Sequence, residues 1–166
     1  MTLLAIDPGR SVKPSIGFAV FGWEWVRIIG PDVIPRREKW WSEWSRGEVT
    51  WDELCLKLND SEHGNLRFGL DSIEEVVVEN FINNPTSRGG QTNGASEVIG
   101  AVEYACARTG TLFTRQPNTI LPVAKLHAGY TQKLKHLPHQ DAAFLHGYYY
   151  LVERGIFTSK GLEATI

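Results

Sequence analysis

Cysteine is scarce in this sequence, and long apolar runs are missing. The 166 residues include two cysteines, Cys55 and Cys106, which both fall in helical apolar patterns and form no C-x-x-C pair. We therefore expect reduced core thiols and a cytoplasmic setting. No apolar run approaches the roughly 18 residues of a membrane span, and no basic region followed by an apolar stretch opens the chain. We expect neither a transmembrane helix nor a signal peptide.

Excess charge of either sign is also missing. The formal net charge is −2 and the pI is near 6.2. This balance argues against a broadly cationic coat for nucleic acid, but it leaves room for a local basic groove. The hydrophobic content of 42% suits one globular domain over residues 1–166. Internal repeats, low-complexity tracts and long linkers are not found in the sequence.

Two uninterrupted apolar runs open the chain. Leu3–Ile6 lead directly into Asp7, and after Pro8-Gly9 a second run spans residues 16–21. Such runs are typical of central strands that are covered on both faces. Residues 23–29 alternate polar and apolar side chains, which predicts a third strand. The three strands together predict an antiparallel meander.

Helical spacing appears after the meander. Three tryptophans predict a helix over residues 38–46, and Thr50 is suited to cap a second amphipathic helix over residues 51–58. The tryptophan-rich region, Trp40–Trp51, is either a packed face or a surface for a partner.

The next segment alternates strand, helix and strand. Residues 73–81 form an apolar run that again ends at a carboxylate, Glu79, and a polar, glycine-containing loop follows over residues 83–93. A helix is expected over residues 95–106 and a further strand over residues 111–115. This alternation predicts a parallel βαβ unit.

Two helices are expected in the last third of the chain. A short one begins near Asn118 and ends near His127, and a long one runs from Pro138 to Arg154, where Gly155 stops it.

Three acids lie at the ends of three elements. Asp7 and Glu79 each end an apolar strand, and Asp141 opens the last helix, with Ala142 and Ala143 behind it to allow close approach to the sheet. If the two strands are neighbours, their carboxylates lie side by side and repel each other unless a cation lies between them. Mg²⁺ or Mn²⁺ with oxygen ligands suits such a site. Two such ions about 3.5–4 Å apart support phosphodiester hydrolysis.

Each acid also has a purely structural interpretation. Asp7 can serve as the turn residue of Asp-Pro-Gly, and Glu79 can pair with an arginine. Asp141 occupies a helix start, where capping and the helix dipole favour an acid without any function. Their joint placement is what points to a metal site.

The motifs, taken in order, resemble those of the RuvC-like Holliday-junction resolvases. The opening motif is Leu4–Gly9 with the strand of residues 16–20, the second is Val76–Phe81, and the closing one is Pro138–Ala143. The opening motif is shared with the wider RNase H-like superfamily and with actin-like ATPases, whereas all three in a chain this short are more specific. The compact form is closest to bacteriophage-encoded members, which act in a bacterial host cytoplasm.

The resemblance implies an RNase H-like fold, a five-stranded mixed sheet with helices on both faces. It also implies a homodimer that makes two symmetric nicks across a four-way junction. We therefore expect a Mg²⁺-dependent, structure-selective DNA endonuclease for which Mn²⁺ substitutes, with no organic cofactor and no membrane partner. Two alternatives stay open: a less selective nuclease acting on flaps, forks or RNA–DNA hybrids, and a catalytically silent nucleic-acid-binding module. The Trp40–Trp51 region is a candidate dimer surface.

The closing motif departs from the family pattern of two acids three residues apart, in which histidine replaces the first acid in some members. One register makes Asp141 the first acid and leaves Phe144 at the second position. The other makes Asp141 the second and leaves Pro138 at the first, with His139 beside it. We favour the second register, in which His139 is a ligand or a general acid/base; the alternative is an exposed first-turn histidine. His146 lies off the face of Asp141 on a regular helix and is a weaker candidate.

Basic and polar residues in loops are the candidate DNA contacts. Those that follow Asp7 suit a phosphate, those in the loop after Glu79 correspond by resemblance to branch-point contacts, and later ones suit a backbone track. The set is Arg10, Lys13, Arg88, Gln91, Asn93, Arg115, Lys125, Lys133 and Lys135. The alternative for each basic residue is solvated surface.

Overall fold

The computed structural model describes residues 2–9, 15–28, 36–59, 65–69, 71–80, 94–130 and 137–157. Seven strands lie in this part of the chain: β1 (Leu3–Asp7), β2 (Ile16–Ile28), β3 (Arg36–Val49), β4 (Leu66–Phe68), β5 (Asp71–Ile73), β6 (Glu75–Asn80) and β7 (Leu112–Pro117). The helices are α1 (Trp51–Asn59), α2 (Gly94–Thr109), the short 3₁₀ helix η1 (Asn118–Ile120), α3 (Leu121–His127) and α4 (His139–Glu153).

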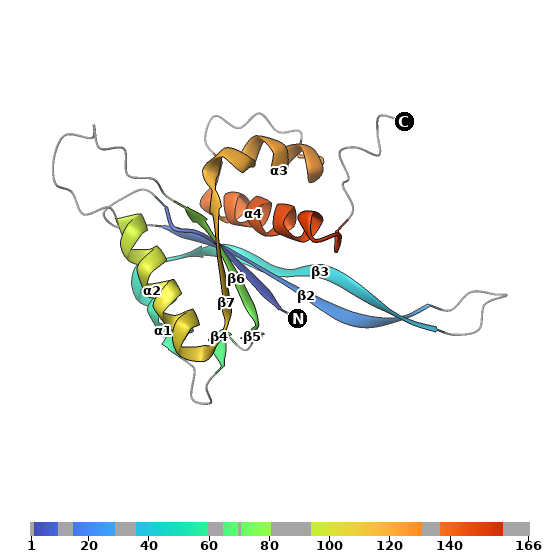
Figure 1. Ribbon diagram of the computed structural model, residues 1–166, viewed down its shortest axis with the longest axis horizontal. Coiled ribbons are helices and arrows are strands. Elements are labelled where there is room, and N and C mark those ends of the chain that lie inside the picture. Colours follow the sequence, from blue (N-terminus) through green and yellow to red (C-terminus); the bar gives the residue numbers. More distant parts are fainter. Residues whose placement is uncertain are drawn as a thin grey trace.

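Five strands form one mixed sheet in the order β3-β2-β1-β6-β7 (Figure 1). β1 pairs antiparallel with β2, and β2 pairs antiparallel with β3. β1 and β6 are parallel, and so are β6 and β7. The expected combination of an antiparallel meander with parallel strands is therefore confirmed, and α2 connects the parallel pair β6 and β7 as predicted.

Helices cover both faces of this sheet (Figure 1). On one face α1 and α2 share a core with the side chains of Leu4 and Ile6, and on the other α4 packs on Leu3 and Ala5. All five residues of β1 are buried. The prediction of a central strand covered on both sides is confirmed, because alternate side chains of β1 enter different cores.

The helix predicted over residues 38–46 is wrong, since these residues belong to β3. Tryptophan fits a strand well, and β3 pairs with β2 along its whole length. The register shifts once, where Val20 faces Ser45 but Phe21 faces Glu43, so that Trp44 is an extra residue in β3. Such a bulge interrupts the period of two. The tryptophan spacing consequently imitates a helix.

Two further strand assignments need correction. Residues 23–28 are not a separate third strand but the continuation of β2, and the third strand of the meander is β3. The strand expected over residues 73–81 is divided: Ile73 ends β5, and β6 covers Glu75–Asn80. β5 pairs with β4 in a two-stranded sheet that the sequence analysis did not predict.

The predicted helix ends are largely confirmed. The backbone N–H of Glu53 donates to Thr50 Oγ1 (3.3 Å), and the Thr50 N–H donates to Glu53 Oε2 (2.8 Å), which is a capping box for α1. Gly155 follows α4 with a φ of 67°, a conformation that favours glycine at a helix end. Both cysteines are free, and burial raises the pKa of the Cys106 thiol to about 12. No helix in the described ranges is long and apolar enough to cross a membrane.

Candidate active site

Asp7 and Glu79 occupy equivalent positions at the ends of neighbouring parallel strands. Ile6 of β1 pairs with Val78 of β6, and each acid is the next residue along its strand. Both acids lie on the face that α4 covers, because Ala5 and Val77 two residues earlier belong to the core under that helix. Asp7 is 7% and Glu79 4% exposed. The two carboxylates therefore lie on adjacent strand ends, as predicted, and both are buried.

The start of α4 lies directly on β2 beside this pair. Gly17 faces Asp7 across the β1–β2 ladder, and a Cβ atom at Gly17 would lie 2.0 Å from the backbone carbonyl carbon of His139. Further along α4, a Cβ at Gly147 would lie 2.3 Å from the Phe21 ring. Ala143 is fully buried in the same contact. The prediction that small residues let this helix approach the sheet holds, with glycines at the two closest points.

Asp7 has a partner on each oxygen. The Gly9 backbone N–H donates to Oδ1 (2.9 Å), and Gly9 has a φ of 69°. The Asp-Pro-Gly turn interpretation therefore accounts for the hydrogen bond of one carboxylate oxygen. Oδ2 lies 3.0 Å from Nδ1 of His139. The turn and the histidine contact coexist, and the turn aims the second oxygen at α4.

His139 is held at the start of α4 from two sides. Its backbone N–H donates to Oε1 of Glu48 (3.1 Å), a residue of β3 that replaces a helix-capping side chain. The hydrogen bond with Asp7 raises the pKa of the His139 imidazole, burial opposes the rise, and the charges of Asp7, Glu48 and Glu79 add to it. His139 is therefore not an exposed first-turn histidine. Its ring contacts Asp7, and the surrounding carboxylates favour its protonated form.

Asp141 has different partners. Nη1 of Arg46 donates to Oδ1 (2.9 Å), and the Tyr130 hydroxyl donates to Oδ2 (3.1 Å). Arg46 also binds Glu43 through Nη2 (2.8 Å) and lies 4.0 Å from the centre of the Phe144 ring. Both oxygens of Asp141 are thus occupied, one of them by a charged arginine, and the structure does not bring this acid into contact with Asp7 or Glu79.

Glu79 faces a buried pair of polar residues. Nε2 of His146, a fully buried residue of α4, lies 3.7 Å from Glu79 Oε2. Its other ring nitrogen, Nδ1, lies 3.0 Å from Oε1 of Gln116. Gln116 pairs with Glu79 in the β6–β7 ladder and is 5% exposed. Three elements therefore place one connected polar group behind Glu79.

Asp7 and Glu79 suit a hard divalent cation. In the described part of the chain neither carboxylate forms an ion pair with lysine or arginine. Two buried like charges need a cation or protons to be stable, and carboxylate oxygens are the preferred ligands of Mg²⁺ and Mn²⁺. Nevertheless, no three His, Cys, Asp or Glu side chains among the described residues are grouped closely enough to hold a metal ion. The fit therefore rests on two ligands, with His139 next to them.

Few of the candidate DNA contacts lie in the described part of the chain. Arg115 of β7 is exposed, and its Nη2 lies 2.5 Å from Glu103 Oε2. Lys125 lies in the last turn of α3. The other candidates fall outside the described residues, namely Arg10, Lys13, Arg88, Gln91, Asn93, Lys133 and Lys135. Phe81 of the second motif also falls outside them.

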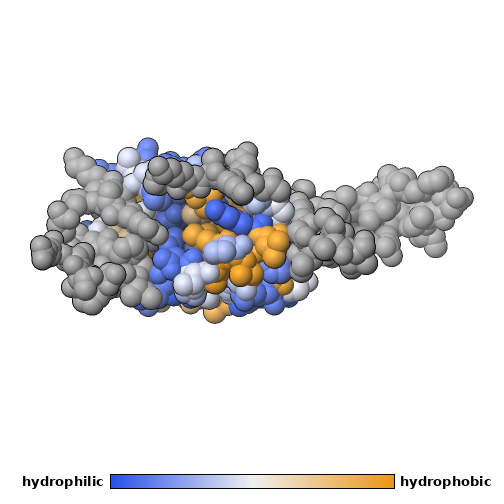
Figure 2. Space-filling view, turned by 90° about the horizontal axis from the view of Figure 1, so that it is seen from above, coloured by the Kyte–Doolittle hydropathy of each residue, from blue (hydrophilic) through white to orange (hydrophobic). Residues whose placement is uncertain are grey.

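The surface around Lys125 is more apolar than a phosphate track. Figure 2, seen from above, shows hydrophobic side chains gathered over the centre of the face that carries α3. Val123 and Leu126 of this helix are 44% and 55% exposed. Lys125 therefore shares its helix with two exposed apolar side chains.

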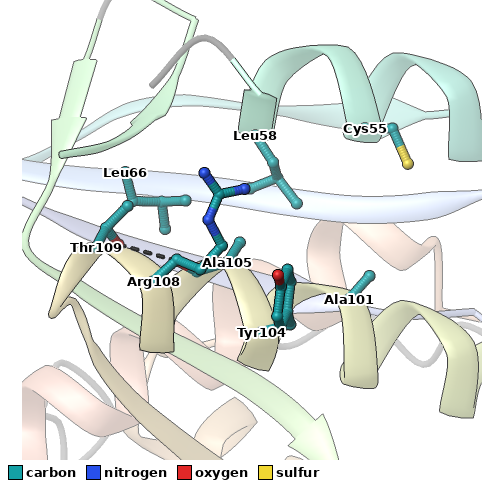
Figure 3. Close-up of a pocket in the computed structure, with 8 residues that line it drawn as sticks. All are labelled: Cys55, Leu58, Leu66, Ala101, Tyr104, Ala105, Arg108 and Thr109. Atoms are coloured by element: carbon teal, nitrogen blue, oxygen red, sulfur yellow. Dashed lines mark hydrogen bonds between the residues drawn. The ribbon is translucent and has the colours of Figure 1, made fainter. Parts of the chain in front are cut away.

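A hollow on the opposite face is unrelated to the acids. It lies between α1 and α2, has a volume of about 150 Å³, and includes Cys55, Tyr104 and Arg108 in its wall (Figure 3). None of its lining residues is acidic. The sheet separates it from Asp7 and Glu79, so it plays no part in the site described above.

Three residues around the acids are not among the candidates from sequence, namely Arg46, Glu48 and Gln116, and a fourth, His146, was a weaker candidate. Arg46 and Glu48 lie on β3, which was misread in part as a helix. Gln116 ends a strand next to the strand of Glu79, and this signal was available once a parallel pair was expected. His146 was set aside as lying off the face of Asp141, but that face contacts Arg46 and not Glu79.

The strand order, the mixed pairing and the helices on both faces define the RNase H-like class of fold. Among solved structures the chain is similar to RuvC of T. thermophilus in complex with a Holliday junction substrate, with a TM-score of 0.53 and 14% identity over 95% of this chain and 99% of that chain. T. thermophilus RuvC alone gives a TM-score of 0.49 at 14% identity. No protein-family model and no curated protein matches the sequence. The chain thus has a RuvC-like fold.

Proposed function

We propose that this protein is a divalent-metal-dependent endonuclease that resolves Holliday junctions or other branched DNA. The observation that carries the proposal is the pair of buried carboxylates, Asp7 and Glu79, on neighbouring strand ends under the start of α4. The RuvC-like fold supports it, because the similar T. thermophilus protein is described with a Holliday junction substrate. Mg²⁺ as the ion and a homodimer as the active form are part of the same proposal.

In this proposal the side chains around the site have different roles. Asp7 and Glu79 hold the cation, which when bound supplies neutralisation of the phosphate charge and activation of the attacking water. His139 keeps one oxygen of Asp7 oriented through the 3.0 Å contact. Asp141 would have to leave Arg46 and Tyr130 to become a third ligand.

His146 has a positioning role in the same proposal. With its proton on Nδ1 the ring turns a lone pair toward Glu79, which is unfavourable at 3.7 Å. If the Gln116 amide presents its NH₂ to Nδ1 instead, the ring proton lies on Nε2 and faces Glu79 Oε2. This arrangement fixes one oxygen of Glu79 and leaves the other for a ligand.

Replacing His146 with leucine should therefore weaken metal binding by about 10- to 100-fold, the usual effect of losing a residue that orients a ligand. Titration calorimetry with Mn²⁺ measures this affinity, and thermal unfolding without metal measures the structural cost separately. His146→Gln, which keeps a donor, should recover part of the affinity. As a matched control, His127→Leu on α3, a histidine that packs on Tyr149, should leave the affinity unchanged. A purely structural histidine would lower the unfolding temperature without changing the affinity of the folded protein.

The test of the proposed function is cleavage of a panel of labelled substrates, namely a four-way junction, a flap, a fork and a linear duplex, with Mg²⁺ or with EDTA. We expect cleavage of the junction with Mg²⁺, none with EDTA, and little cleavage of the duplex. Equal cleavage of all substrates would support the less selective nuclease instead.

The engagement of Asp141 by Arg46 favours one second candidate, a catalytically silent module that binds branched DNA. Binding of the junction without cleavage in either Mg²⁺ or Mn²⁺ would support that candidate and contradict the nuclease.

A further inference from the structure

The strands β2 and β3 extend far beyond the sheet. β1 pairs with β2 only from Gly17 to Phe21, whereas β2 and β3 remain paired as far as Ile28 and Arg36. The bulge at Trp44 lies where the two strands leave the sheet. From that point they form a two-stranded arm, residues 22–28 and 36–42, which runs past α4 in Figure 1. A bulge increases twist and redirects a ribbon, so it sets the direction of the arm.

The arm has an unusual composition for this chain. It contains four of the six tryptophans, four basic residues (Arg27, Arg36, Arg37 and Lys39) and two acidic ones (Glu24 and Glu38). Its net charge is therefore +2, whereas the other residues, with 13 basic and 17 acidic side chains, carry −4. The arm therefore concentrates aromatic and cationic residues, whereas the rest of the chain is net acidic.

The register of the arm places like charges opposite each other. Arg27 pairs with Arg37, and Lys39 lies two positions further along β3 on the same face of the ribbon, whereas Arg36 pairs with Ile28 on the other face. Like charges directly opposite on a ribbon are destabilising, and an isolated two-stranded ribbon is only marginally stable. These charges therefore destabilise the free arm, and an anion that neutralises the arginines would remove this destabilisation.

We propose that this arm is a second DNA-contacting surface, which grips the phosphate backbone of a duplex arm of the substrate outside the cutting site. Arginines bind phosphates, and indole rings provide stacking surfaces for bases that a branched substrate leaves unpaired. A second copy of the arm is a poorer partner, because two arms that each carry a net charge of +2 repel each other. The inference rests on the proposed function in its choice of branched DNA as the ligand.

The length of the arm locates this contact on the DNA. A strand rises roughly 3.3 Å per residue, so Ile28 lies about 35 Å along β2 from Gly17, the residue that faces Asp7. This distance is close to one helical turn of duplex DNA. The contact should therefore fall about one turn from the scissile phosphate. Substrates whose duplex arms are shorter than one turn cannot reach it.

The experiment compares wild type with a shortened protein in which Asn-Gly replaces residues 25–39, joining the paired residues Glu24 and Trp40 by a two-residue turn. Fluorescence anisotropy in EDTA measures binding to four-way junctions with arms of about 6 or 16 base pairs. We expect wild type to bind the long-armed junction at least about tenfold more tightly than the shortened protein does. The two proteins should bind the short-armed junction alike.

A substitution series gives a second readout that does not depend on shortening the chain. Replacing Arg27, Arg36 and Arg37 with glutamine should reduce the slope of log affinity against log salt by about 3, one unit for each lost phosphate contact. The matched control replaces Lys57, Arg67 and Arg108, which lie on α1, β4 and α2, with glutamine and should leave the slope unchanged.

The outcomes separate the inference from the function on which it rests. If the shortened protein binds the long-armed junction as tightly as wild type, the inference is wrong. If it is a monomer by sedimentation where wild type is a dimer, with unchanged DNA affinity per site, the arm is a surface for a second copy and the inference is also wrong. Arm-dependent binding without any cleavage would contradict the proposed nuclease and support the inference.

Discussion

Asp7→Asn should abolish junction cleavage, with a loss of about a thousandfold or more, and leave DNA binding intact. The amide keeps the shape of the side chain and can still accept the Gly9 N–H through its oxygen. It loses the negative charge that the proposed cation requires and that faces His139. Single-turnover cleavage of a labelled four-way junction in Mg²⁺ gives the rate, and anisotropy in EDTA gives the affinity.

The matched control for this prediction is Asp52→Asn. Asp52 lies in the first turn of α1, on the opposite face of the sheet, so the same chemical change there should leave the cleavage rate unaltered. Wild-type cleavage by Asp7→Asn would remove Asp7 from the site. Loss of both cleavage and DNA binding would indicate that the fold, rather than the cation, had been lost.

Gly17→Ala should strongly destabilise the protein and slow cleavage. The new methyl would lie 2.0 Å from the His139 carbonyl carbon, so α4 must move away from β2. Overpacking of this kind costs about 1–3 kcal/mol of unfolding free energy, and a displacement near 1 Å costs about a hundredfold in rate. Urea denaturation and single-turnover cleavage measure the two effects.

Gly100→Ala is the control for this prediction. Gly100 lies within α2, and no atom beyond its own neighbourhood lies within 4 Å of a Cβ built there. Alanine is a better helix former, so this variant should gain up to about 1 kcal/mol and cleave at the wild-type rate. If Gly17→Ala matched wild type in stability and rate, the close packing of α4 on β2 described here would be incorrect.

The elements that the sequence predicted well are those with an uninterrupted pattern. β1 is apolar at every position before Asp7, and α1 has both a capping threonine and an amphipathic face, so local chemistry and burial agree. β3 was predicted wrongly, because one extra residue at Trp44 changes the phase of its alternation. β4 and β5 have three residues each, too few for any period to be recognised.

The site was predictable only where a residue ends a recognisable strand. Asp7 and Glu79 each follow an apolar run, and parallel pairing of those runs brings them together. The contacts of Asp141 and His146 were not predictable, because they depend on the rotation of α4 about its axis. That rotation depends on two contacts between distant segments, Gly17 of β2 with the backbone of His139 and Gly147 of α4 with the Phe21 ring, and the helix sequence alone does not define them. His139 was left open for the same reason.

The most direct test of the account is a crystal structure of the protein soaked in Mn²⁺, with anomalous scattering measured near the manganese edge. The account predicts an anomalous peak between the carboxylates of Asp7 and Glu79, under the start of α4, and its disappearance in Glu79→Gln. A peak elsewhere, or none at saturating Mn²⁺, would contradict the claim that these paired strand-end acids form the metal-binding active site.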